Sequence, residues 1–176
     1  MSCFIIPVMK NTVFIGLGSN LGDREMYIHR AIERLRDHPG FSFFRVSSFY
    51  DTPSVGWDGP DYLNAVCSFE TALDAENVHD FLKQTEMAFG RVRSVQNAPR
   101  TLDLDLLSYG NQTFSTAELT VPHPRLHERA FVLVPLREIA AHWVHPLSHK
   151  TVEELLAVLP EADLKSIKSY ENYSQR

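Results

Sequence analysis

Two different hydrophobic periods alternate along this sequence, and their order limits the folds that the chain can adopt. Residues 62–71 alternate apolar and polar side chains, which is the period of a half-buried β-strand. Residues 24–38 instead place apolar side chains three and four positions apart, which is helical spacing. The same reading predicts strand, helix, strand, strand, helix and strand for residues 12–19, 24–38, 41–52, 62–71, 75–89 and 101–110. The order β-α-β-β-α-β is typical of a ferredoxin-like α+β sandwich.

Composition and charge narrow the class of protein. A chain of 176 residues with 44% hydrophobic side chains can bury a core as one domain. We expect an N-terminal extension over 1–11, a domain over 12–162 and a flexible tail over 163–176. The net charge of -5 argues against nucleic-acid binding, and no apolar run approaches the ~20 residues of a membrane span. We therefore expect a cytoplasmic monomer or weak homo-oligomer, with neither nucleic acid nor membrane as a partner.

The sequence TLDLDLLSYG (101–110) sets two carboxylates inside an otherwise apolar strand. Side chains two residues apart on a strand share a face, so Asp103 and Asp105 point together, away from Leu104 and Leu106. Two carboxylates held so close repel unless a cation lies between them. Mg²⁺ commonly binds one or two carboxylates together with substrate phosphates. The alternative is an exposed strand face that happens to carry two acids.

Basic side chains flank this strand on both sides, although the chain as a whole is acidic. The flanking residues are Arg91, Arg93 and Arg100 before the strand, and His123, Arg125 and Arg129 after it. Cations beside a carboxylate pair suit the binding of a metal–polyphosphate complex. A solvated basic loop that balances nearby acids is the alternative.

Three further patterns carry less information. The segment GLGSN (16–20) matches neither the phosphate loop nor the dinucleotide fingerprint. We interpret it as a tight turn, with Ser19 and Asn20 either near a site or in a structural role. Tyr62 and Asn64 share one strand face and could stack on and hydrogen-bond to a flat heterocycle. The histidines of HWVHPLSH are expected at the surface, because no cysteine or carboxylate stands at ligand spacing.

Six motifs occur in one order over roughly residues 12–160. They are GLGSNLGD (16–23), SSFYDTPSVG (47–56), PDYLNAV (60–66), GRVR (90–93), PRTLDLDLLSYG (99–110) and VPHPRLHERAFVLVPL (121–136). With these motifs the sequence resembles the 6-hydroxymethyl-7,8-dihydropterin pyrophosphokinases, which are enzymes of folate biosynthesis. The resemblance implies a ferredoxin-like three-layer α/β sandwich with a mostly antiparallel sheet, in agreement with the element order above.

The resemblance also implies a reaction. Such an enzyme transfers a pyrophosphoryl group from ATP to the hydroxymethyl group of 6-hydroxymethyl-7,8-dihydropterin and releases AMP. ATP would be the co-substrate, and Asp103 and Asp105 would hold two Mg²⁺ ions that bridge the triphosphate. Either aspartate could also receive the proton of the attacking alcohol.

The resemblance further implies a role for individual residues. ATP and its phosphates would be contacted by Glu86, Arg91, Arg93, Arg100, His123 and Arg129. The catalytic residues would be Arg91, Arg100, Asp103 and Asp105. The pterin would be contacted by Thr52, Pro53, Val55, Tyr62, Asn64, Phe131 and Asp103. Tyr62 and Phe131 would stack on opposite faces of the pterin ring, and the polar loop 91–100 would become ordered when both substrates bind.

Two other functions fit part of this pattern. A diverged relative could bind pterin or nucleotide without turnover, although both aspartates and the matching arginines are present. A two-metal nucleotidyl transferase on a similar sandwich would also need the paired carboxylates. That enzyme would release pyrophosphate, and it gives no reason for Tyr62, Asn64 and Phe131.

Overall fold

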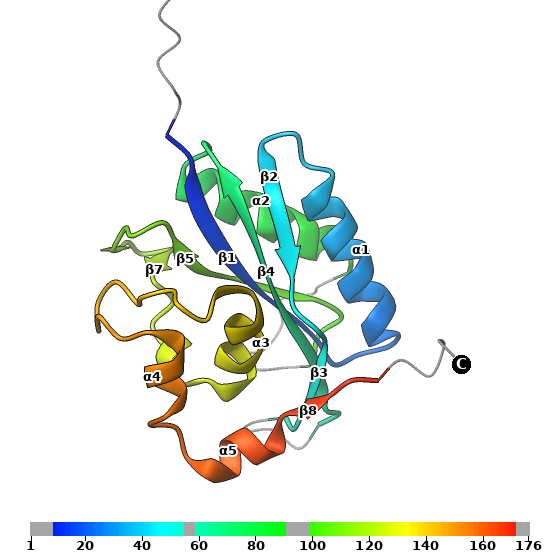
Figure 1. The fold of residues 1–176 in the computed structure, drawn as a ribbon. Helices are drawn as coiled ribbons and strands as arrows, with labels where there is room; N and C mark the ends of the chain where they lie inside the picture. The colour runs from blue at the N-terminus through cyan, green and yellow to red at the C-terminus, as the bar shows by residue number, and fades with distance from the viewer. Residues whose placement is uncertain (1–8, 55–58, 91–98, 172–176) are drawn as a thin grey trace, which may run out of the picture.

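A computed structural model of the chain describes residues 9–54, 59–90 and 99–171, and it places one sheet between two layers of helices (Figure 1). The strands are β1 (Asn11–Ser19), β2 (Phe41–Val46), β3 (Tyr50–Thr52), β4 (Tyr62–Thr71), β5 (Asp103–Tyr109), β6 (Phe114–Ser115), β7 (Thr120–Val121) and β8 (Lys168–Ser169). The helices are α1 (Arg24–Arg36), α2 (Ala75–Ala88), α3 (Ala130–Ala140), α4 (Val152–Leu156) and α5 (Glu161–Ser166), with a 3₁₀ turn at Leu126–Glu128.

The main sheet has six strands in the described residues, with the order β5-β1-β4-β3-β8, and β2 also pairs with β4. Every pairing in this sheet is antiparallel. The short strands β6 and β7 form a separate antiparallel pair. These pairings and the two helical layers confirm the predicted ferredoxin-like α+β sandwich.

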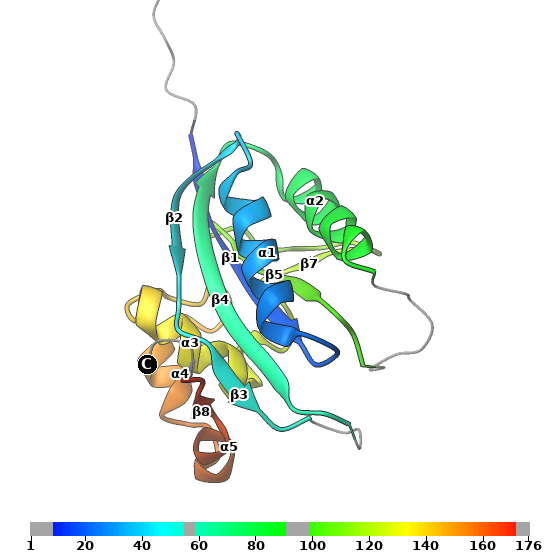
Figure 2. The ribbon, with the colours of Figure 1, turned by 90° about the vertical axis from the view of Figure 1, so that its right-hand side faces the viewer.

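Helices cover both faces of the sheet (Figure 2), and each face buries its own apolar cluster. Helices α1 and α2 cover one face, where side chains such as Ile15 and Leu63 are completely buried. Helices α3 and α4 cover the other face, where Phe14, Val66 and Leu107 form part of the second cluster. The alternation of strand side chains produces this division, because neighbouring residues of one strand point to opposite faces.

The two helices on the first face begin where the sequence predicts. Asp23 accepts a hydrogen bond from the backbone N–H of Met26 at the start of α1, at 3.0 Å. Asp74 accepts one from the backbone N–H of Asn77 at the start of α2, at 2.8 Å. Each such cap satisfies a backbone donor that the first helical turn leaves unpaired, and contributes about 1 kcal/mol.

The C-terminal segment differs from the expected flexible tail. Residues 163–166 complete α5, and β8 then pairs with β3 along the edge of the sheet. The backbone N–H of Tyr170 donates to the carbonyl of Phe49 at 2.8 Å, and the Tyr170 ring packs against the first cluster. Edge pairing uses backbone groups, so the polar side chains of this segment gave no signal of it.

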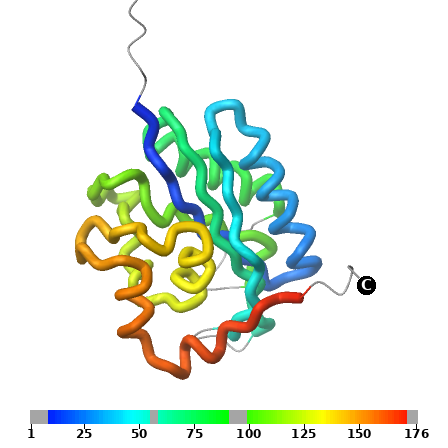
Figure 3. The backbone as a smooth tube through the Cα atoms, in the orientation of Figure 1, coloured from blue at the N-terminus to red at the C-terminus, as the bar shows by residue number. Residues whose placement is uncertain are grey.

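Figure 3 shows how the described ends of the backbone leave the sheet. The N-terminal end leads into β1 at one end of the sheet, and the C-terminal segment passes beside β3 near the other end. Among the described residues, no helix combines the length and the apolar character that crossing a bilayer requires.

Candidate active site

A cavity of about 310 Å³ opens on the face of the sheet that α3 covers. Strands β1, β3, β4 and β5 and the segment from His123 to Val132 contribute its walls. The lining residues are Gly16, Leu17, Gly18, Asn20, Thr52, Pro53, Ser54, Tyr62, Asn64, Ala65, Arg100, Asp103, Asp105, Leu107, His123, Arg125, Arg129, Phe131 and Val132. Ten of the residues that the sequence predicts as site residues are therefore together in one cavity: Thr52, Pro53, Tyr62, Asn64, Arg100, Asp103, Asp105, His123, Arg129 and Phe131.

The floor of the cavity is a pair of glycines beside the pair of aspartates. In the β1–β5 register, Gly18 lies opposite Asp103 and Gly16 lies opposite Asp105. Leu104 and Leu106 point the other way into the first apolar cluster, as the two-residue period predicts. A Cβ atom on Gly18 would lie 3.0 Å from Oδ1 of Asn64, so a side chain here would press on the cavity wall. Gly18 is thus needed for space, although its strand conformation is one that any residue adopts.

Each aspartate lies next to an arginine. Arg100 Nη1 donates to Asp103 Oδ1 at 3.0 Å, and Arg129 Nη1 lies 3.6 Å from Asp105 Oδ2. Burial, the largest single cause, lowers the pKa of Arg100, but the charge and hydrogen bond of Asp103 outweigh it together with smaller effects of Tyr62 and Asp105, so the net shift is upward. Two negative side chains therefore lie side by side at this end of the cavity, each beside a positive one. We call Arg100, Asp103, Asp105 and Arg129, together with His123, the charged end.

His123 is neutral at physiological pH. Burial, followed by the positive charges of Arg129 and Arg125, lowers the pKa of His123 to about 4. Its Nδ1 accepts a hydrogen bond from the backbone N–H of Arg125 at 3.1 Å. The remaining ring nitrogen then carries the proton, so the neutral ring has an N–H available to donate.

The adjoining part of the cavity is aromatic and uncharged, and we call it the aromatic end; it borders the charged end, since the Arg129 guanidinium lies 5.5 Å from the centre of the Phe131 ring. Tyr62 and Asn64 point into it from β4, Phe131 from the start of α3 and Thr52 from β3. Asn64 Nδ2 donates to Thr52 Oγ1 at 2.7 Å in a buried hydrogen bond. This bond fixes the orientation of the amide, whose Oδ1 lies near Gly18. An oriented amide in a cavity with aromatic walls suits the edge of a flat heterocycle.

The segment GLGSN is not the tight turn that we expected from its glycines. Gly16, Gly18 and Ser19 lie within β1, and the positive φ of the turn falls at Gly22. Asn20, just past the strand, accepts a hydrogen bond at Oδ1 from the backbone N–H of Arg100, at 2.7 Å. Its backbone N–H also donates to the Arg100 carbonyl at 3.2 Å. Asn20 therefore fixes the backbone from which the Arg100 side chain reaches Asp103.

One predicted site residue lies elsewhere in the structure, and three others fall outside the described residues. Glu86 extends from α2, which covers the opposite face, and its Oε1 accepts the backbone N–H of Leu104 at 2.7 Å. Val55, Arg91 and Arg93 lie outside the described residues. The expected ordering of the loop 91–100 concerns residues that also lie mostly outside this range.

Sequence reasoning missed several cavity residues and misplaced one histidine. Gly16, Gly18 and Ser54 were not proposed for the site, and Arg125 was noted only as part of the basic flank. His145, expected at the surface, is 3% exposed, and its Nδ1 accepts the backbone N–H of Ser148 at 3.2 Å. In the part of the chain that the structure covers, no group of three or more His, Cys, Asp or Glu side chains could hold a metal ion.

Comparisons with known proteins agree with this geometry. Residues 14–141 match the family model of 7,8-dihydro-6-hydroxymethylpterin-pyrophosphokinase (HPPK). The 2-amino-4-hydroxy-6-hydroxymethyldihydropteridine pyrophosphokinase of Bacillus subtilis is 42% identical over 132 residues, which cover 74% of this chain and 79% of that protein. The protein of the same name from Haemophilus influenzae is 41% identical over 158 residues, which cover 89% of this chain and 97% of its own length.

Solved structures show the same fold in a longer chain. A variant of Plasmodium falciparum HPPK-DHPS with pterin and p-hydroxybenzoate matches with a TM-score of 0.68 at 12% identity. The match covers 88% of this chain and 44% of that chain, so this chain spans less than half of it. From the family model and the two bacterial relatives, this chain belongs to the 7,8-dihydro-6-hydroxymethylpterin-pyrophosphokinase family, the enzymes that transfer a pyrophosphoryl group from ATP to 6-hydroxymethyl-7,8-dihydropterin in folate biosynthesis.

Proposed function

We propose that this cavity holds both substrates of the reaction, with the triphosphate of ATP at the charged end and the pterin at the aromatic end. One observation carries the proposal: Gly18 lies between Asn64 of β4 and Asp103 of β5 in the sheet register. The two ends therefore meet across one glycine. A hydroxymethyl group that extends from the pterin would arrive beside the carboxylates without any side chain between them.

At the aromatic end, Tyr62 and Phe131 would stack on the two faces of the pterin ring. The polarised edge of a pterin carries both donors and acceptors, which an oriented amide such as that of Asn64 can match. Thr52 and Pro53 would close the end of the pocket, together with Val55 from outside the described residues. An aromatic pair with ring contacts contributes roughly 0.5–1.5 kcal/mol beyond its buried area.

At the charged end, Asp103 and Asp105 would hold two Mg²⁺ ions. Their carboxylates lie on one strand face, with glycines on the neighbouring strand, so the donor set is open on the cavity side. Two hard carboxylate donors fit Mg²⁺, which takes its remaining ligands from phosphate oxygens and water. When bound, such ions neutralise the triphosphate and polarise the phosphorus that is attacked.

The residues of the chain itself align the substrates and neutralise charge. The alcohol oxygen of the pterin forms a bond to Pβ, the bond from Pβ to the α-bridging oxygen breaks, and AMP carries that oxygen away. Arg100 and Arg129 would neutralise the phosphate oxygens, and the neutral His123 ring would donate one hydrogen bond. The proton of the alcohol passes to Asp103, to Asp105 or to water at the same site. Alignment and charge neutralisation account for most of the catalysis that such a transfer requires.

Three further residues have roles in this proposal. Arg91 would act on the transferred group, with Arg93 as a further phosphate contact, as the family pattern implies. Glu86 is better placed to support the strand than to touch ATP, since it binds the Leu104 N–H between the two aspartates. It would hold the spacing of Asp103 and Asp105.

Counting bound metal ions tests the assignment of the charged end. Mn²⁺ added to the chain with a non-hydrolysable ATP analogue and pterin should bind at two sites per chain, as read by electron paramagnetic resonance. Asp105→Asn should lose at least one of these sites, whereas Glu70→Gln, an acid at the far end of β4, should keep both. Two retained sites in Asp105→Asn would show that the metals are held elsewhere.

A further inference from the structure

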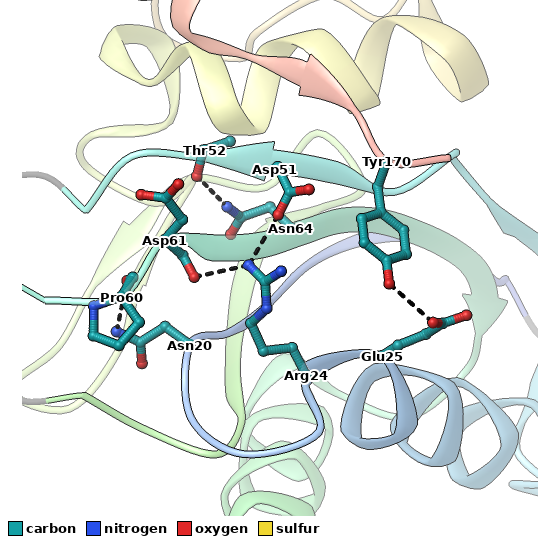
Figure 4. A network of polar contacts seen from close by, with 9 residues as sticks. All are labelled: Asn20, Arg24, Glu25, Asp51, Thr52, Pro60, Asp61, Asn64 and Tyr170. Carbon is teal, nitrogen blue, oxygen red and sulfur yellow. Dashed lines mark hydrogen bonds and ion pairs between the residues drawn. The ribbon is translucent and has the colours of Figure 1, made fainter. Parts of the chain in front are cut away.

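Arg24 links the start of α1 to both strands that carry the aromatic end (Figure 4). Its Nη1 donates to Asp51 Oδ1 of β3 at 2.9 Å and to the backbone carbonyl of Asp61 at 2.9 Å. Asp61 immediately precedes Tyr62, the first residue of β4. One guanidinium nitrogen therefore joins three separate segments of the chain.

The position of Arg24 is unusual for a positive charge. It is the first residue of α1, directly after the Asp23 cap, where the positive end of the helix dipole disfavours a cation. The side chains of Arg24 and Asp51 are 28% and 33% exposed, so their ion pair is partly shielded from water. The two acceptors, Asp51 and the Asp61 carbonyl, therefore stabilise an arginine at this position, whereas the helix dipole does not.

The contact reaches the cavity through the backbone of β3. Asp51 pairs with Leu63, whose side chain lies in the core beneath α1, so Asp51 points to that face. The next residue, Thr52, points to the opposite face, where it lines the cavity and accepts the hydrogen bond from Asn64. Arg24 thus holds the strand from behind, at the residue before Thr52.

Besides the Arg24 contact, β3 is anchored to α3, because the Tyr50 hydroxyl donates to Glu138. The strand is three residues long, with β4 on one side and the two-residue strand β8 on the other. Neighbouring contacts tie the same region together: Asn20 Nδ2 donates to the Pro60 carbonyl at 3.4 Å, and Tyr170 donates to Glu25 at 3.1 Å (Figure 4). So short a strand depends on side-chain anchors for its exact placement.

We propose that Arg24 is a positioning residue for the pterin pocket. It sets the placement of Thr52 and of the Asn64 amide that Thr52 orients, and through Asp61 it sets the start of β4 at Tyr62. Arg24 itself touches no substrate, because it acts from the opposite face of the sheet. The inference rests on the proposed binding of pterin by Thr52, Tyr62 and Asn64.

Separate affinities for the two substrates test this role. Arg24→Gln should raise the pterin dissociation constant about tenfold, which corresponds to about 1.4 kcal/mol. It should raise KM for pterin similarly, while kcat and the affinity for an ATP analogue change by less than about twofold. Arg24→Lys, which keeps the charge and can donate to Asp51, should recover part of the lost pterin affinity.

Two further variants serve as controls. Arg36→Gln makes the same change at the last residue of α1, where the guanidinium lies 5.5 Å from the Phe44 ring, and should leave both affinities unchanged. Asp51→Asn removes the charge of the Arg24 partner with little change of shape. This variant should show the same loss of pterin affinity, and it provides the test if Arg24→Gln does not fold. The double variant should then lose little more than either single variant.

The outcomes separate this inference from the function on which it rests. A folded Arg24→Gln protein with unchanged pterin affinity would overturn the positioning role. Equal losses of pterin and ATP affinity would overturn it as well, because they indicate general destabilisation. Asn64→Leu provides the independent check: if it binds pterin normally, the proposed pterin site itself is wrong.

Discussion

The charged end and the aromatic end of the cavity are built in different ways. Arg100, Asp103 and Asp105 lie within six residues of one another on or just before β5, and His123 and Arg129 follow on one segment. The aromatic end instead collects Thr52, Tyr62, Asn64 and Phe131 from β3, β4 and α3. A local stretch of chain can place charges, whereas a pocket for a flat ring depends on the register of several strands.

This difference predicts that variants at the two ends affect different steps. Removing a group at the charged end should lower turnover, because its interactions with the phosphates strengthen as the transition state forms. Removing a group at the aromatic end should weaken pterin binding in the ground and transition states alike, which raises KM.

The largest effect is expected from the two aspartates. Asp103→Ala and Asp105→Ala should each lower turnover by on the order of a thousandfold, because the phosphates lose the metal ions and their alignment. The fold should persist, since both carboxylates lie on the cavity face and the neighbouring Leu104 and Leu106 keep their packing. Rates of AMP release at saturating Mg²⁺ measure the effect, with Glu70→Ala as the matched acid. Near-normal turnover in either folded aspartate variant would contradict the metal assignment.

The two aromatic side chains should affect the other substrate. Tyr62→Ala and Phe131→Ala should each weaken pterin binding severalfold to about a hundredfold, through lost stacking and lost buried area. The affinity for an ATP analogue should change by less than about threefold. Isothermal titration with each ligand separates these effects, and Tyr62→Phe should retain most of the affinity. Unchanged pterin binding in both alanine variants would remove these rings from the pocket.

Gly18 lies at the boundary between the charged end and the aromatic end, so a substitution there shows which end is crowded more. A Cβ there would lie 3.0 Å from Asn64 Oδ1 but 3.8 Å from the Cβ of Asp103, so crowding falls mainly on the aromatic end. Gly18→Ala should therefore weaken pterin binding about tenfold and ATP binding less. Gly16→Ala, whose Cβ would have the Leu107 side chain as its nearest neighbour at 3.4 Å, should have a smaller effect. A larger loss of ATP affinity than of pterin affinity would reverse the assignment of the two ends.

The smallest effect concerns His123 and stability. Because the pKa of His123 falls from 6.5 to about 4 on folding, the unfolded chain binds more protons between these values. The free energy of unfolding therefore decreases as the pH falls through this window. His123→Asn should make that decrease less steep, as measured by denaturant unfolding at about pH 5 and about pH 7. An identical pH dependence in both proteins would show that His123 is not held neutral by its surroundings.

The sequence predicts those parts of the fold and site that depend on local period. Asp103 and Asp105 point to the cavity from β5, and Tyr62 and Asn64 point to it from β4, as two-residue alternation requires. Helices α1 and α2 also begin at the predicted positions, directly after the Asp23 and Asp74 caps. Each of these features depends on side chains a few residues apart.

Features that depend on strand partners escaped the sequence reasoning. The use of Gly18 as a floor becomes visible only when β1 is placed between β4 and β5. Strand β8 was expected to be tail, because its pairing with β3 uses backbone groups common to any sequence. Glu86 was expected at ATP, but the packing of α2 directs its carboxylate to the Leu104 N–H.

A crystal structure with Mn²⁺, a non-hydrolysable ATP analogue and pterin would show directly whether the two ends of the cavity bind the two substrates. We predict two anomalous peaks within bonding distance of the Asp103 and Asp105 carboxylates, with the triphosphate between these peaks and Arg129. We also expect the pterin ring between Tyr62 and Phe131, with its hydroxymethyl group directed past Gly18 toward Pβ. Metal ions away from both aspartates, or a pterin bound outside the aromatic end, would contradict the assignment of the two ends to the two substrates.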